Sequence, residues 1–322
     1  MADSGFEAVA AQFAALSVDR VSSRYTEDVL HKAPYKPLLL LSVLQLIDEG
    51  KVTSREISPV LHPLAEAFLH YGAIVPQGRK HQMALPFYHM GSEDFWELID
   101  HQGEVRQAKG AQLRSMGLLR EEVAHARLTE DAWVVLSDSD GRAALREHLI
   151  VTHFSETAGE RLREQREVNM DANEYADRLL EMRADAERMR ETREPVRNQG
   201  FRKAVQTAYD HRCAFTGLRL LTPEYHTAID AAHIVPWKES HDDRVQNGLA
   251  LSKLCHWAFD EGLLGVTESS LIRVSPFVAR GGHRVGQLLD LDGREIHRPE
   301  SEEHHPDPES FDWHLKNTFT RW

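Results

Sequence analysis

Cysteine is almost absent from the 322-residue chain, which contains only Cys213 and Cys255. Two thiols are too few to build a disulfide framework or a four-thiolate zinc site. We therefore expect both cysteines to be buried as small apolar side chains.

Targeting signals and long apolar segments are also missing. The N-terminus has no basic segment followed by an apolar stretch, so we expect no signal peptide. The longest apolar run covers residues 37–43 and is far too short to span a bilayer. We expect a cytoplasmic protein with no membrane partner.

Positive charge is scarce, because 38 Lys and Arg residues face 51 Asp and Glu residues and give a net charge of −13. This balance is the opposite of what phosphate binding normally needs. However, residues 79–81 and 197–203 are local basic groups, and a site for a divalent cation needs carboxylates. Bulk charge therefore does not exclude a nucleic-acid ligand.

The first half of the chain has the pattern of one compact, mostly helical domain. Apolar residues recur at helical spacing in residues 5–18 and 36–50. Residues 78–90 are expected to form a loop that leads into a short extended segment, and residues 92–100 have the aromatic character of a strand. Residues 105–150 predict further helices.

Composition changes abruptly at residues 155–193, which are rich in Glu, Arg, Ala and Met. We expect a charged connecting helix. Its irregular apolar stripe is not the clean heptad repeat of a coiled coil, although a homodimer formed through this segment stays open. The predicted fold class is α+β, with three parts: a mostly helical domain at residues 1–154, a helical linker at 155–194, and a second domain at 195–322.

The second domain contains a compact series of predicted elements. A strand over residues 230–235 is followed by a loop over 241–248, a strand over 249–251 and a helix over 253–261 that Gly262 ends. A β-hairpin is expected after this helix.

Residue types suited to metal-assisted phosphodiester hydrolysis lie along this series. His233 can take a proton from water, because imidazole titrates near neutrality. His256 and Asp260 are four residues apart on the predicted helix and share one face, a spacing that suits Mg²⁺ or Mn²⁺. Asp230 is a conditional metal ligand, because in a strand it faces away from His233. Asn247 is expected to hold the loop in place by side-chain hydrogen bonds.

Four motifs in this domain resemble the restriction-type branch of the HNH endonuclease family. They are RCAFTG at residues 212–217, AAHIVPW at 231–237, NGLAL at 247–251 and LCHWAFDEGLLG at 254–265. The resemblance implies a ββα-metal fold in which two strands and a helix hold one divalent cation. It also implies that His233 is the general base, Asn247 the middle Asn and His256 a metal ligand, with Asp260 where some relatives have another ligand.

One position departs from that family. Relatives often have a metal-binding Asp or His directly before the base, whereas this chain has Ala232. The ligand set would then include Asp230, or be completed by water and DNA phosphate. Further candidates are His226, His241 and Asp242.

The first domain resembles the sulfur-binding domain of phosphorothioate-dependent type IV restriction enzymes. The resemblance lies in KAPYKPLLLLSVLQLIDEG at residues 32–50 and GRKHQMALPFYHM at 78–90. Such domains recognise a DNA backbone in which sulfur replaces a non-bridging oxygen. Because sulfur is larger, more polarisable and less hydrated than oxygen, a shallow apolar pocket favours it.

The resemblance implies a set of DNA- and sulfur-binding residues. Tyr35 and Lys36 match a polar and basic pair, and Arg79 and Lys80 form a basic loop beside the pocket. The segment that matches an aromatic-Pro-aromatic motif consists of Leu85, Pro86, Phe87, Tyr88 and His89. Leu85 replaces the common aromatic, and Lys36 replaces the frequent Arg.

Three functional hypotheses remain open on the sequence. The first is a metal-dependent endonuclease directed to modified, phosphorothioated double-stranded DNA. The second is an HNH nuclease that another DNA feature or a protein partner targets. The third is a non-catalytic DNA-binding or regulatory protein with a degenerate HNH fold, a hypothesis that Ala232 keeps open.

Overall fold

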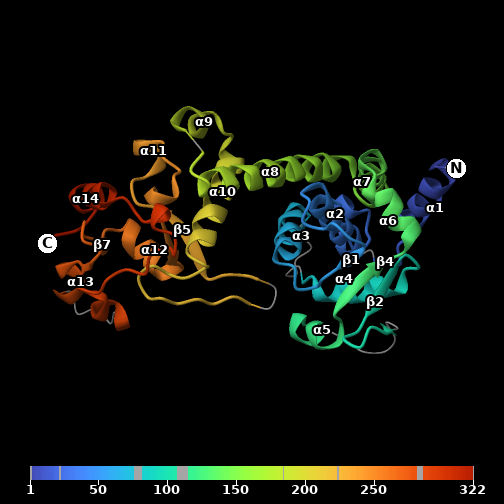
Figure 1. Cartoon of the computed structure of the whole chain (residues 1–322), viewed down its shortest axis with the longest axis horizontal. Coiled ribbons are helices and arrows are strands. Elements are labelled where there is room, and N and C mark those ends of the chain that lie inside the picture. Colours follow the sequence, from blue (N-terminus) through green and yellow to red (C-terminus); the bar gives the residue numbers. More distant parts are fainter. Residues whose placement is uncertain are drawn as a thin grey trace. The chain divides into compact units, whose positions relative to one another are not determined.

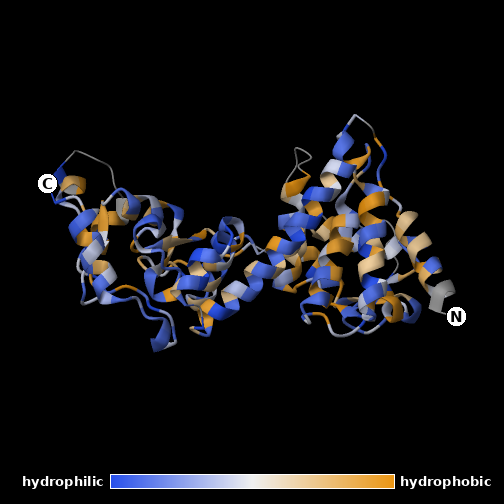
Figure 2. Cartoon of the chain, turned by 90° about the horizontal axis from the view of Figure 1, so that it is seen from above, coloured by the Kyte–Doolittle hydropathy of each residue, from blue (hydrophilic) through white to orange (hydrophobic). Residues whose placement is uncertain are grey.

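Helix α2 (Tyr35–Asp48) lies at the centre of the N-terminal half because its sequence leaves almost no polar face. Every residue from Lys36 to Leu46 is buried. A helix of this kind needs neighbours on all sides. It packs against α3 (His62–Ile74), α4 (Ala84–His89) and α7 (Ser139–His153). The helix predicted from residue 36 onward is confirmed, and hydrophobic stretches run along the helices of this half in Figure 2.

The computed structural model describes residues 2–21, 23–75, 82–106, 115–183, 185–222, 225–280 and 286–321. It divides into two units, labelled by element in Figure 1. Unit 1 comprises residues 1–170 and 223–225, and unit 2 comprises residues 171–222 and 226–322.

Unit 1 combines helices with one small antiparallel sheet whose strand order is β1-β4-β2-β3. The strands are β1 (Glu56–Ile57), β2 (Trp96–Ile99), β3 (Val105–Arg106) and β4 (His125–Leu128). The remaining helices are α1 (Ala2–Ala14), α5 (Met116–Glu122), α6 (Glu130–Ser137) and the first part of α8 (Glu156–Leu180). One hydrophobic core joins these elements, with the exception of β3.

Two secondary-structure expectations for unit 1 were wrong. The segment expected to be a loop and then extended chain contains the helix α4, and the stretch expected to be helical contains β3 and β4. In α4, Pro86 occupies the third helical position, where its missing N–H costs no hydrogen bond. Burial of Phe87 and Tyr88 in the core then stabilises the helix.

The charged segment is helical, as expected, but it is not one uninterrupted rod. It contains α8 and α9 (Ala186–Glu191), and α10 (Glu194–Ala208) begins with Pro195 in its first turn. The division between the two units falls inside α8, after Met170. The three-part domain division made from the sequence stays a prediction.

Unit 2 is built around the antiparallel pair β5 (Ile229–His233) and β6 (Gly248–Ser252), against which α10 and α12 (Lys253–Asp260) pack. The register places His233 opposite Gly248. The predicted strand–loop–strand–helix order is therefore confirmed. The other α-helices and strands are α11 (Trp237–Ser240), β7 (Leu264–Val266), β8 (Ile272–Val274), α13 (Pro276–Arg280) and α14 (Pro308–Asn317).

The ends of α12 follow from local chemistry. Ser252 caps the helix, since its side chain accepts a hydrogen bond from the backbone N–H of Cys255. Gly262 has a φ of +69°, and a Cβ there would lie 2.1 Å from the carbonyl oxygen of Thr318. Only glycine fits this position, so the helix ends where the sequence predicts.

The overall class is α+β, as the sequence predicts. Cys213 and Cys255 are both free and buried, as expected. Across the described ranges, no helix combines the length and apolarity needed to cross a bilayer.

Candidate active site

His233 is the last residue of β5, and its imidazole is held on two sides. The ring stacks on Phe201 of α10, with centroids 3.8 Å apart and planes 8° apart. Its Nε2 lies 2.7 Å from Oδ1 of Asp243, a side chain with no exposed surface. A carboxylate can only accept a hydrogen bond, so Nε2 carries the proton of this pair. The neutral ring then presents Nδ1 as its proton acceptor.

Asn247 fastens the loop between β5 and β6. Its amide oxygen accepts from the backbone N–H of Val235 at 2.9 Å. Its amide nitrogen donates to the carbonyl oxygens of Val235 at 3.0 Å and Asp242 at 2.8 Å. The side chain is buried, so these bonds are shielded from water. Asn247 thereby fixes the chain that leaves His233, while its catalytic role stays a prediction.

His256 and Asp260 face each other one turn apart on α12. Nε2 of His256 lies 3.4 Å from Oδ2 of Asp260. Partial removal from water raises the pKa of Asp260 above its ordinary value, and repulsion by Glu261 adds to this, while attraction to His256 and His233 opposes it. Helix α12 packs against β5, so the pair lies on an element in contact with the strand that ends at His233.

The other metal-ligand candidates have different surroundings. Asp230 forms an ion pair with Arg202 of α10 at 3.0 Å. Asp242 pairs with Arg244 at 2.8 Å. Among the described residues, no three His, Cys, Asp or Glu side chains gather closely enough to hold a metal ion. The imidazole of His256 and the carboxylate of Asp260 are two side chains of the kind that bind a divalent cation.

Asp243 is the site residue that sequence reasoning missed. The carboxylate lies ten residues after His233 in an irregular loop, next to the metal-ligand candidate Asp242. Nothing local distinguishes the two aspartates. Only the packing of α8 and α10 shows which one reaches the imidazole, because Tyr175 and Arg197 both contact Asp243.

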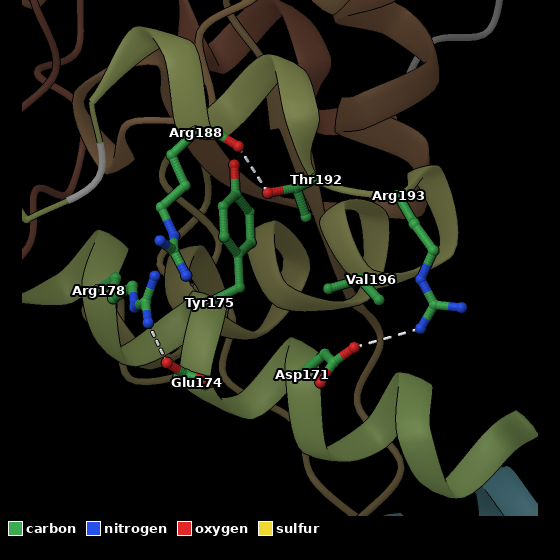
Figure 3. Close-up of a pocket in the computed structure, with 8 residues that line it drawn as sticks. All are labelled: Asp171, Glu174, Tyr175, Arg178, Arg188, Thr192, Arg193 and Val196. Carbon is green, nitrogen blue, oxygen red and sulfur yellow. Dashed lines mark hydrogen bonds and ion pairs between the residues drawn. The ribbon is translucent and has the colours of Figure 1, made fainter. Parts of the chain in front are cut away.

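Tyr175 also lines a cleft of about 280 Å³ between α8, α9 and the start of α10, shown in Figure 3. Arg178 pairs with Glu174 there, and Arg193 pairs with Asp171 at 3.2 Å. These pairs neutralise most of the charge in the cleft. Arg188 also lines the cleft. Tyr175 is the lining residue that contacts the site, because its hydroxyl donates a hydrogen bond to Asp243.

The predicted DNA- and sulfur-binding residues of unit 1 lie at the start of α2 and along α4. Lys36 is buried, forms an ion pair with Glu93 and donates to Oγ of Ser92 at 3.1 Å. Its charge is thus balanced inside the unit. Tyr35 is half-buried.

Helix α4 divides the motif of residues 85–89 between core and surface. Pro86, Phe87 and Tyr88 are buried, and Phe87 packs edge-on against Trp96 with centroids 5.3 Å apart. Leu85 is half-buried and His89 is exposed. Partial removal of the ring from water, followed by repulsion from Lys36, lowers the pKa of His89. Arg79 and Lys80 lie outside the described residues.

Two antiparallel strands and a helix form a ββα unit, in which His233 ends the first strand, Asn247 directly precedes the second and His256 lies on the helix. Family comparison agrees: residues 213–267 match the HNH endonuclease family, and residues 11–168 match the ScoMcrA-like DNA sulfur-binding domain. The chain thus contains an HNH endonuclease domain at residues 213–267 and a ScoMcrA-like DNA sulfur-binding domain at residues 11–168.

Whole-chain comparisons add little to the domain matches. No curated protein matches the chain. A solved structure described as a modification-dependent TagI restriction endonuclease shares 24% identity, over 38% of this chain and 39% of its own, with a TM-score of 0.29. The match thus spans well under half of that protein.

Proposed function

We propose that this protein is a metal-dependent endonuclease that hydrolyses double-stranded DNA and is directed to phosphorothioated DNA by unit 1. The nuclease proposal is carried by one observation: the His256–Asp260 pair shares a ββα unit with His233, whose Nδ1 is available as an acceptor. The targeting proposal is supported by the match of unit 1 to DNA sulfur-binding domains.

The residues divide the work of hydrolysis. His233 takes a proton from the attacking water at Nδ1. Asn247 holds the end of β5 and the following loop in place, so that the imidazole of His233 keeps its orientation. His256 and Asp260 would hold a divalent cation, and such an ion stabilises the charge that develops on phosphoryl and leaving oxygens.

The degenerate-fold alternative is less consistent with the site. Ala232 is buried and supplies no ligand. However, the base retains a buried carboxylate partner, and the imidazole–carboxylate pair on α12 is intact. Burying a carboxylate such as Asp243 is costly unless it is paired and hydrogen-bonded, and here His233 and Tyr175 are its partners.

Sulfur selection would depend on the half-buried and exposed side chains of α4. Leu85 offers apolar surface, and His89 lies beside it at the end of the helix. Apolar contact favours the weakly hydrated sulfur over a phosphate oxygen. Since one site per chain must cut two strands, the function also favours a homodimer.

The first prediction compares three otherwise identical plasmids: phosphorothioated, cytosine-methylated and unmodified. With Mg²⁺ or Mn²⁺, we expect cleavage of the phosphorothioated plasmid only, because sulfur recognition brings the nuclease unit to its substrate. Agarose gel analysis of nicked and linear products measures the result. Equal cleavage of all three plasmids contradicts the targeting proposal, and DNA binding without cleavage under any metal supports the degenerate alternative.

The second prediction concerns Leu85→Ala. Removing this apolar surface should reduce the preference for phosphorothioated over unmodified DNA by about tenfold, the usual effect of one lost apolar contact. Fluorescence anisotropy with matched duplexes measures both affinities. The control is Leu118→Ala on α5 of the same unit, whose side chain is 45% exposed. An unchanged preference in Leu85→Ala, with an unchanged Tm, removes Leu85 from the sulfur site.

A further inference from the structure

Asp243 is a fully buried carboxylate on which several helices converge. Oδ2 accepts a hydrogen bond from the hydroxyl of Tyr175 of α8 at 2.9 Å. Oδ1 accepts from Nε2 of His233 at 2.7 Å and faces Nη1 of Arg197 of α10 at 3.5 Å. Its backbone N–H donates to the sulfur of Met189 of α9 at 3.3 Å. Three successive helices, α8, α9 and α10, thus each supply one side chain that contacts Asp243.

The surroundings of Asp243 are those of a fixed acceptor. Burial raises the pKa of Tyr175, and Asp243 raises it further, so the hydroxyl keeps its proton and can donate it. The Arg197 guanidinium is itself held over the ring of Trp237, 3.9 Å from the centroid. Both oxygens of Asp243 therefore have donors, and neither is left unsatisfied.

A satisfied carboxylate beside an imidazole selects one tautomer of the ring. Because Asp243 cannot donate, Nε2 of His233 must hold its proton toward it. The other nitrogen, Nδ1, is then unprotonated in the neutral ring, and within the described part of the chain no hydrogen bond to it is found. Such a carboxylate also stabilises the imidazolium that forms when the base takes a proton.

Tyr175 is a residue of α8 that belongs to the site around His233. Figure 3 shows its side chain rising from α8 beside Arg188 and Thr192. The sequence predicts residues 155–194 to be a plain linker, and the HNH family match begins only at residue 213. The hydroxyl of Tyr175 is nevertheless two hydrogen bonds away from the imidazole of His233.

We propose that Asp243 is a positioning residue that holds His233 with Nε2 protonated and Nδ1 free, and that Tyr175 and Arg197 hold Asp243 in turn. This inference rests on the proposed nuclease function for its consequence in catalysis. The tautomer itself is a property of the protein without DNA or metal. The proposed tautomer and the proposed nuclease function can therefore be disproved separately.

The tautomer is tested on the full chain with ¹⁵N-labelled histidine, without DNA or divalent cation. Long-range ¹H–¹⁵N spectra at a pH where the ring is neutral should show a protonated Nε2 and an unprotonated Nδ1 for His233, assigned by its loss in His233→Ala. In Asp243→Asn the amide can face the ring as donor or acceptor, so we expect both tautomers. A wild-type ring protonated at Nδ1 overturns the proposal, whether or not the protein cuts DNA.

Cleavage gives the second readout. Asp243→Asn should lower kcat between about 10- and 100-fold with little change in KM, because asparagine keeps an acceptor oxygen but loses the charge. The matched control is Asp242→Asn, which removes the neighbouring carboxylate that pairs with Arg244. Equal kcat values for the two variants overturn the positioning role.

Tyr175→Phe covers the case in which Asp243→Asn does not fold. It removes only the hydroxyl that donates to Asp243. We expect a several-fold lower kcat, an unchanged KM and a partly mixed His233 tautomer. Its control is Tyr209→Phe, which removes another buried hydroxyl, one that donates to the carbonyl oxygen of Gly248 at 3.3 Å. If both Tyr variants cut like the wild type, Tyr175 has no part in positioning the base.

Discussion

His233→Ala should abolish metal-dependent cleavage of DNA, with a loss on the order of 10³-fold in kcat and unchanged DNA affinity. A general base contributes about 10²–10⁴-fold to the rate. Among the described residues, only the imidazole of His233 lies between Phe201 and Asp243, so no other side chain replaces it as the base. Single-turnover plasmid nicking measures the loss, and fluorescence anisotropy measures the affinity.

His233→Ala leaves a cavity beside Phe201, so the variant also allows a rescue experiment. The alanine leaves the face of Phe201 and the acceptor Asp243 unoccupied, so added imidazole can lie in the same place. We expect imidazole to restore part of the activity of His233→Ala. The control is His305→Ala, which removes another half-buried imidazole, one whose Nε2 lies 3.0 Å from the carbonyl oxygen of Pro299. Full activity in His233→Ala excludes this residue as the base.

The elements of the site could be predicted because each depends on neighbours in the sequence. The helix start at Lys253, the stop at Gly262 and the His256–Asp260 spacing are all local, and the structure has them where the sequence places them. The family resemblance rested on the same stretch, which is why the fold class and the nuclease assignment could be made before the structure was known.

The parts that could not be predicted depend on packing between distant residues. Tyr175 donates a hydrogen bond to Asp243, which lies 68 residues away in the sequence, and Lys36 pairs with Glu93, which lies 57 residues away. Helix α4 forms around Pro86, which reads locally as a break, because burial of Phe87 and Tyr88 outweighs local propensity. Similarly, α8 and α9 have the composition of a solvent-exposed linker. Yet Tyr175 donates a hydrogen bond to the buried carboxylate of Asp243, and the sulfur of Met189 accepts one from the backbone N–H of the same residue.

The second large effect is expected for His256→Ala, with a loss on the order of 10³-fold in cleavage at low metal concentration. Its imidazole lies 3.4 Å from the carboxylate of Asp260, and this is the pair that we propose to hold the cation. With one side-chain ligand removed, the remaining carboxylate, water and phosphate should hold the ion weakly. Isothermal titration calorimetry with Mn²⁺ should therefore show weaker binding, independently of activity.

The metal dependence separates His256 from His233. A lost ligand can be compensated by mass action, so the activity of His256→Ala should rise as Mn²⁺ is increased. A lost base cannot be compensated in this way, and His233→Ala should stay inactive at every Mn²⁺ concentration while binding Mn²⁺ like the wild type. The control is Glu261→Gln, which removes a charge next to Asp260 that acts on its pKa without forming part of the pair. If His256→Ala binds Mn²⁺ as tightly as the wild type, the cation is held elsewhere, and α12 contributes to the site by another route.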